Sequence, residues 1–211
     1  MNSLAVERST LERARSAVPS LADVIPFARA RRDAIELDAL RRADPEAVAR
    51  AYRAHHQAVE AFARRMLGDA EAARDVTHDA FVALPDAAGR FREGASLRTF
   101  LIGIALNLCR RRIRSSVRKR RALGRMEERE VPEPPATPEA ETGRRRLAAA
   151  LQRGLETLPL AQREAFVLCA VEERPSPEVA ELLGVPEGTV RTRLFHAKKK
   201  LRAFLEAEGL S

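Results

Sequence analysis

The clearest chemical pattern in this sequence lies near the C-terminus, in a segment that alternates apolar and cationic residues at helical spacing. One apolar stripe must face a core: Val190, Leu194, Ala197 and Leu201. The opposite face is polar and cationic and carries one aromatic ring: Arg191, Thr192, Phe195, His196, Lys199 and Arg202. Such a face suits the major groove of DNA, where early residues reach base edges and later cations reach phosphates.

A short helix predicted for 177–183 precedes this segment, and Gly184 marks a tight turn between the two. The two helices therefore form a predicted helix-turn-helix. Contact of Phe195 with a thymine methyl group would explain an aromatic residue off the apolar stripe. The alternative is a solvated cationic face with Phe195 packed on its neighbours. DNA binding through so many cations would depend strongly on salt.

A second basic cluster follows an apolar helical segment in the middle of the chain: Arg110, Arg111, Arg112 and Arg114. Just before that segment, residues 91–101 place aromatic rings, cations and hydroxyls around Gly94. Aromatic and guanidinium planes beside a glycine-bearing loop suit unstacked bases of single-stranded nucleic acid. The alternative is that Phe91 and Phe100 belong to the core.

The composition agrees with a helical, polyanion-binding protein. The chain has 211 residues and a net charge of +8, which favours nucleic acid or an anionic membrane surface as partner. Ala, Leu, Arg and Glu dominate and favour helices, so the predicted fold is all-α. The longest apolar stretch, 97–109, is too short and too polar to span a bilayer, and no secretory signal is evident. Cys109 and Cys169 do not show the CxxC spacing of a metal site. They are interpreted as structural thiols in a reducing cytoplasm.

Three similar triplets predict helix starts, each with an oxygen-bearing side chain, a proline and a glutamate: Asp44-Pro45-Glu46, Thr137-Pro138-Glu139 and Ser176-Pro177-Glu178. Further helices are predicted after Asp69, ending at Pro85, and after Ser96, through Ile113 and beyond. In the C-terminal part, one helical face is predicted to hold Leu147, Leu151 and Leu155.

These elements predict two small helical domains joined by a flexible linker. The chain divides into an N-terminal extension (1–43), a first domain (44–115), a linker (116–143) and a helix-turn-helix domain (144–206). The linker changes from basic to acidic and is rich in proline, and its apolar residues do not recur at helical spacing.

Two stretches together resemble the extracytoplasmic-function (ECF) sigma factors, members of the sigma-70 family of RNA polymerase subunits. Residues 70–84, with the loop 91–101 and Ile104-Ala105-Leu106-Asn107, resemble the second conserved region of that family. Residues 178–194 resemble the fourth. The sequence departs from the family pattern at His78, in the order Arg92-Glu93-Gly94-Ala95, and at Arg174-Pro175.

The resemblance implies three sets of binding residues. Docking on core RNA polymerase would involve Asp75, Asp79 and Phe81. The −10 promoter element, melted to a single strand, would be bound by Phe91, Arg92, Ser96, Arg98, Thr99, Asn107, Arg110, Arg111 and Arg114. The −35 duplex would be bound by Thr189, Arg191, Thr192, Arg193, Phe195, His196 and Lys199.

The expected function is therefore promoter-specific transcription initiation in the cytoplasm, with core RNA polymerase, promoter DNA and an anti-sigma factor as partners. No catalytic residue, metal, cofactor or small-molecule substrate is expected, because no HExxH, P-loop or GxSxG motif is present. A stand-alone dimeric helix-turn-helix regulator is the main alternative, and a general RNA-binding protein is another.

Overall fold

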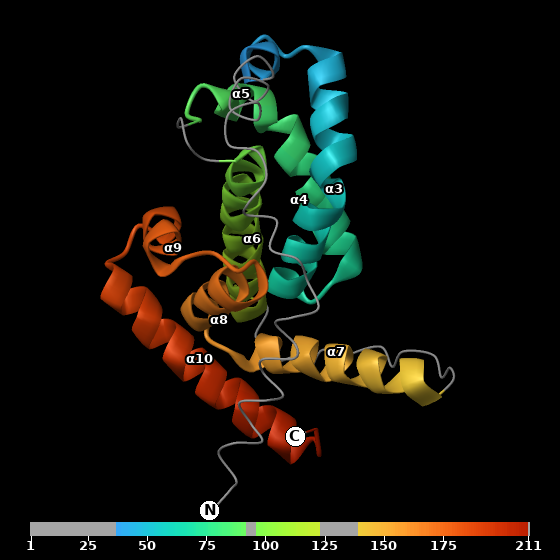
Figure 1. Ribbon diagram of the computed structural model, residues 1–211, viewed down its shortest axis with the longest axis vertical. Coiled ribbons are helices and arrows are strands. Elements are labelled where there is room, and N and C mark those ends of the chain that lie inside the picture. Colours follow the sequence, from blue (N-terminus) through green and yellow to red (C-terminus); the bar gives the residue numbers. More distant parts are fainter. Residues whose placement is uncertain (1–36, 92–95, 123–138, 211) are drawn as a thin grey trace, which may run out of the picture.

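The described part of the chain is helical throughout. The computed structural model describes residues 37–91, 96–122 and 139–210, and among them it contains no strand. This confirms the all-α prediction. The labelled helices are α3 (Pro45–Leu67), α4 (Ala70–Val82), α5 (Leu84–Ala88), α6 (Leu97–Ala122), α7 (Glu139–Thr157), α8 (Leu160–Phe166), α9 (Ser176–Leu183) and α10 (Glu187–Ala207), with a π-helical turn η1 (Val167–Val171) after α8 (Figure 1). Residues 37–41, before α3, are also helical.

The first domain is a bundle in which α3 and α4 lie beside α6 (Figure 1). Its centre holds large apolar side chains that are almost fully buried: Val59, Phe62, Met66, Val76, Leu84, Leu101, Ile102 and Leu106. Burial of this apolar surface is the main stabilising term for the bundle. None of the described helices is long and apolar enough to cross a bilayer.

Side-chain caps begin the three long helices of this bundle. Asp44 Oδ1 accepts hydrogen bonds from the backbone N–H groups of Glu46 and Ala47, at 2.8 and 3.0 Å. These two bonds lower the pKa of the Asp44 carboxyl, because they favour its ionised form. Asp69 caps α4 in the same way, and Ser96 Oγ accepts from the N–H of Thr99 at 3.1 Å. The helix starts predicted at Asp44, Asp69 and Ser96 are confirmed.

Two local predictions were wrong. Pro85 does not end the second helix, which stops at Val82; it stands in the first turn of α5, where its missing N–H costs nothing. Ser176 does not cap α9 either. It is the first helical residue, Pro175 stands at the cap position, and no side chain bonds to the free N–H groups there.

The linker predicted for 116–143 is helical at both ends. Helix α6 continues to Ala122, and α7 begins at Glu139. Arginine and lysine are good helix formers, so the basic run after Ile113 extends α6. The remaining linker residues, and the predicted start Thr137-Pro138, lie outside the described residues.

The second domain consists of α7 to α10, and α10 packs on α7, α8 and α9. Gly184 adopts a left-handed φ of 66°, which gives the tight turn predicted for the helix-turn-helix. Helix α7 projects sideways from the body (Figure 1). As a result Leu147 is 46% exposed whereas Leu155 is 1% exposed, so the face predicted for α7 is buried only near its C-terminal end.

The two cysteines should differ in reactivity. Burial raises the pKa of the Cys109 thiol to about 12. Since the thiolate is the reactive form, roughly one Cys109 in ten thousand would be reactive at about pH 8. Cys169 is half-buried, and burial raises its pKa against an opposing hydrogen bond from Ser176.

We therefore expect iodoacetamide to modify Cys169 in the native protein, and to modify Cys109 only after denaturant is added or the pH approaches the pKa of its thiol. Mass spectrometry of tryptic peptides would measure both. Equal modification of the two thiols in the native protein would contradict this assignment.

Candidate nucleic-acid interface

Helix α10 separates an apolar face from a cationic one, as its sequence predicts. Val190 and Ala197 are fully buried and Leu201 is 3% exposed, whereas Leu194 is half-buried against the same core. The helix starts at Glu187, after Pro186 at the cap position, without a side-chain cap. Packing on α8 and α9 thus fixes which side of α10 faces outward.

The outward side of α10 carries most of the predicted −35 residues. Exposed there are Arg191, Thr192, Phe195, His196 and Lys199, while Thr189 and Arg193 are half-buried at its edges. Phe195 is 65% exposed and its ring meets that of His196 edge to face, with centroids 5.5 Å apart. Phe195 is therefore not part of the core of this domain. The contact of Phe195 with His196 also agrees with the alternative interpretation, a solvated cationic face with Phe195 packed on its neighbours.

The second basic surface lies along α6. Arg98, Asn107, Arg111 and Arg114 are exposed, and Arg110 is half-buried. Ser96 and Thr99 stand at its start, with their hydroxyl oxygens 2.9 Å apart. Phe91 is half-buried, and its ring lies 5.2 Å from that of Phe100, edge to face, on the core of the bundle. Arg92 lies outside the described residues.

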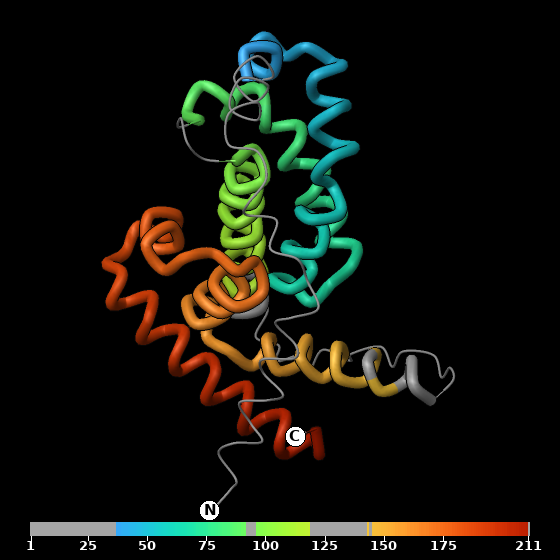
Figure 2. Tube along the Cα trace, in the orientation of Figure 1, coloured from blue at the N-terminus to red at the C-terminus, as the bar shows by residue number. Residues whose placement is uncertain are grey.

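Part of the α6 surface is covered by the second domain, which lies against it (Figure 2). The Arg110 guanidinium donates two hydrogen bonds to the Glu164 carboxylate of α8, from Nε at 2.6 Å and from Nη2 at 2.9 Å. The Glu164 side chain is 5% exposed. This bidentate pair raises the pKa of Arg110, because the hydrogen bonds from the guanidinium favour its charged form.

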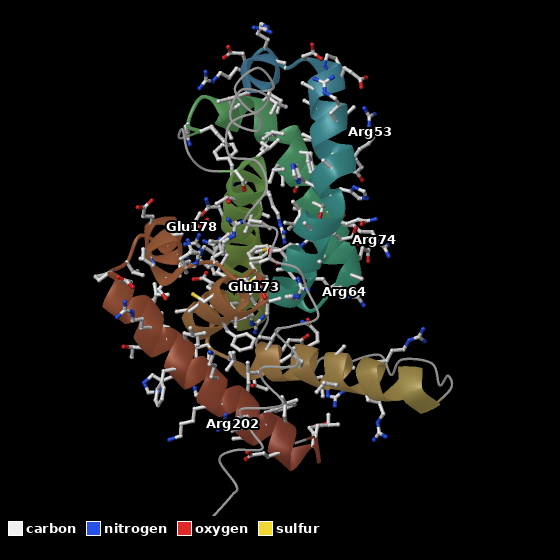
Figure 3. All side chains as sticks on the ribbon, in the orientation of Figure 1. Arg53, Arg64, Arg74, Glu173, Glu178 and Arg202 are labelled. Atoms are coloured by element: carbon white, nitrogen blue, oxygen red, sulfur yellow. The ribbon has the colours of Figure 1, made fainter. Side chains whose placement is uncertain are left out.

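A second carboxylate from the same domain lies at the start of α6. Glu172 Oε2 accepts from Arg98 at 2.7 Å, and Glu172 Oε1 accepts from Arg65 of α3 at 3.4 Å. The Glu172 side chain is 3% exposed. Arg174 donates to the hydroxyl of Thr99 and to Glu178, which lies on α9 at its junction with α6 (Figure 3). Thr99 is thereby buried.

The predicted polymerase-docking residues do not share one environment. Asp75 is exposed and bonds to Arg112 of α6 at 3.0 Å. Asp79 is exposed, but Phe81 is only 4% exposed and its ring packs edge to face on Tyr52, with centroids 5.0 Å apart. Tyr52 itself is 44% exposed and stacks on His56. Phe81 therefore supports this surface from beneath.

A groove of about 730 Å³ lies between α4 and α6 beside the two aspartates. Its lining combines apolar side chains with one carboxylate and four guanidinium groups. The lining residues include Val76, Asp79, Leu108, Arg111, Arg112, Arg114 and Arg118. Asp75 and Asp79 thus belong to a mixed-charge surface with a cationic excess, and not to an isolated acidic patch. Among the described residues no cluster of three metal-ligating side chains occurs.

Several residues of these surfaces carried no signal in the sequence. Glu164 and Glu172 follow no motif, and only the folded chain places them on arginines more than fifty positions away. Tyr52 could have been found, because it lies one turn before His56 in a chain poor in aromatics.

Two family models match the chain. Residues 51–119 match sigma-70 region 2, and residues 148–201 match sigma-70 region 4. The first match covers α4, the groove and α6, and the second covers the helix-turn-helix.

Curated relatives agree with both matches. The chain is 33% identical over 154 residues to the ECF RNA polymerase sigma factor SigM of Mycobacterium tuberculosis, covering 73% of this chain and 74% of SigM. It is 32% identical over 163 residues to the RNA polymerase sigma factor CnrH of Cupriavidus metallidurans, covering 74% of this chain and 85% of CnrH.

Two solved structures have a similar fold. CnrH in complex with the cytosolic domain of CnrY superposes with a TM-score of 0.58 at 26% identity, over 83% of this chain and 97% of CnrH. RpoE of Bartonella quintana, in complex with the anti-sigma factor NepR, superposes with a TM-score of 0.60 at 22% identity, over 72% of this chain and 91% of RpoE. The second likeness concerns the fold alone.

Proposed function

The chain belongs to the ECF sigma factors of the sigma-70 family, and from this premise we propose how its two domains divide the reading of a promoter. Sigma factors recognise promoters in company with core RNA polymerase, and the family consists of transcription factors, not enzymes. The proposed division assigns the −35 duplex to the domain of α7–α10, and the melted −10 strand to the domain of α3–α6. Residues 44–115 and 144–206 would be the binding domains.

The observation that carries this division is the outward face of α10. Arg191, Thr192 and Phe195 lie early on that face and would reach base edges in the major groove. Lys199 and Arg202 lie later and would reach phosphates. His196 and the half-buried Arg193 and Thr189 would border the contact. A dimeric regulator would also need a symmetric interface, and the second cationic surface on α6 favours a chain that holds DNA with both domains.

We assign the −10 strand to the start and outer face of α6. Ser96, Thr99 and Asn107 offer hydrogen-bonding groups to an unstacked base, and the ring of Phe91, which packs on Phe100, would add an apolar contact. Backbone phosphates would be held by Arg98, Arg110, Arg111 and Arg114. Arg92 belongs to this assignment through the sequence resemblance.

For core polymerase we propose the surface of α4 with Asp75 and Asp79, extended by the exposed Tyr52 of α3 and by Val82, which is 64% exposed. Charged groups around exposed apolar side chains are typical of a protein interface. An anti-sigma factor that binds this chain is also part of the proposal. It is supported by the solved structure of the similar CnrH in complex with the cytosolic domain of CnrY. A cytoplasmic location follows from the proposed polymerase partner.

The test of this function is run-off transcription with core RNA polymerase, the purified chain and a library of genomic promoter fragments. We expect transcripts from a small set of fragments, all dependent on added chain, with none from core polymerase alone. Initiation that is equally efficient without the chain would contradict the proposal. A chain that binds palindromic duplex DNA as a dimer, and does not bind polymerase, would favour the regulator instead.

A further inference from the structure

The α6 surface assigned to the −10 strand and the outward face of α10 differ in accessibility. On α10 most of the assigned contact residues are open to solvent, and only Thr189 and Arg193 are half-buried. On α6 the second domain lies over Thr99 and Arg110, and Leu182 of α9 approaches Gly103 so closely that a Cβ there would lie 3.4 Å from it. The covered face thus runs along three turns of α6, and it belongs to the surface that the proposed function needs.

The covering groups are carboxylates at the positions where phosphates would bind. Glu164 takes both the Nε and the Nη2 donors of Arg110, so this edge of the guanidinium fork is no longer available to a phosphate. Glu172 takes a donor of Arg98 and one of Arg65. Both carboxylates are almost fully buried, so neither can leave its arginines without separating the domains.

The promoter itself requires a different arrangement. By their names the two elements lie about 25 base pairs apart, or about 85 Å along B-form DNA at about 3.4 Å per pair. In the closed chain the domains touch, and α9 lies beside α6. The arrangement that spans a promoter is therefore an open one, in which Glu164 and Glu172 have left α6.

We propose that the free chain is held closed by Glu164 and Glu172, which occupy Arg110 and Arg98 of α6 in place of DNA phosphates and cover part of the −10 surface until the domains separate. This inference rests on the proposed function. Only the open molecules bind single-stranded DNA through this surface. The apparent affinity is therefore reduced in proportion to the fraction of molecules that are open. Binding of core polymerase, which needs the open form, would release the surface.

The first test measures single-strand binding by the free, full-length chain. Replacing both carboxylates, Glu164→Gln and Glu172→Gln, should raise the affinity for a labelled DNA strand of about 20 nucleotides by about tenfold. The matched control, Glu46→Gln with Glu208→Gln, removes the same charge from exposed pairs within single domains and should change the affinity less than about twofold. An equal gain in the control would overturn the proposal.

A second test measures the separation of the two domains by energy transfer between two dyes. Dyes would be placed by Arg53→Cys on α3 and Arg202→Cys on α10, two outward positions at opposite parts of the molecule, in a Cys169→Ala background (Figure 3). Buried Cys109 would stay unlabelled. Energy transfer should fall with Glu164→Arg alone and return with Arg110→Glu and Glu164→Arg together. Unchanged transfer in the single variant, or no recovery in the pair, would contradict a closed state held by this contact.

Run-off transcription separates this inference from the proposed function. If the unaltered chain fails to support initiation, the proposed function itself fails. If it initiates normally and the double glutamine variant binds the free strand no better, only the closed state is refuted.

Discussion

Replacing Arg191 by alanine should lower transcription from promoters that depend on the −35 element by about ten- to a hundredfold. A lost base-edge contact costs about 1–3 kcal/mol, and each 1.4 kcal/mol corresponds to about a factor of ten. Arg191 is well suited to such a contact, because its side chain is 70% exposed and its partner in the free chain is Glu187, one turn earlier on the same helix. The measurement is run-off transcription at fixed salt.

The matched control for this variant is Lys200→Ala. It removes the same charge from the same helix, but nine residues, about two and a half turns, place Lys200 on the opposite side from Arg191. We expect less than about a threefold loss there. Binding to core polymerase should be unchanged in both variants. Loss of polymerase binding in Arg191→Ala, or an equal loss of transcription in Lys200→Ala, would remove α10 from the proposed promoter contact.

Replacing Asp75 by arginine should have the opposite pattern: polymerase binding should weaken by at least about tenfold, while −35 duplex binding by the free chain survives. Asp75 neutralises Arg112 at 3.0 Å, so the variant places two cations side by side on the docking surface. Like charges at an interface cost association energy and slow the encounter. Fluorescence anisotropy of labelled chain against core polymerase would measure the change.

Two further variants test whether the added cation and its position cause this loss. Asp75→Asn removes the charge without adding a cation and should give an intermediate loss. Asp38→Arg makes the same reversal beside Arg41, on an exposed pair before α3, and should bind polymerase normally. Thermal unfolding checks that the domain still folds. Polymerase binding at full strength by Asp75→Arg would exclude α4 from the docking surface.

Much of the fold could be predicted, because it depends on local chemistry. The caps Asp44, Asp69 and Ser96 start their helices where the sequence predicts, since a cap needs only two or three neighbouring residues. The two wrong predictions, for Pro85 and Ser176, concern residues whose local sequence is compatible with more than one structure. Pro85 is compatible with either a helix end or a first turn, and packing of Leu84 in the core settles it as the start of α5.

The −35 residues could be predicted better than the −10 residues for a physical reason. Helical periodicity divides α10 into a buried and an outward face, so Val190 and Phe195 could be placed from their spacing alone. On α6 the outward residues face another domain. Whether Arg110 meets solvent or Glu164 depends on how the two domains pack, and periodicity within one helix carries no information about that.

The sequence by itself determined most of the helices, the buried and outward faces of α10, the turn at Gly184 and the family, since these follow from residues close together in the chain or from whole-segment patterns. The tertiary structure alone decided that Phe81 is buried beneath Tyr52, and that Glu164 and Glu172 neutralise arginines of the other domain. Ion pairs between distant residues depend on the relative position of two separately folded surfaces. That position is set by the sum of many weak contacts across the chain, which no single segment encodes.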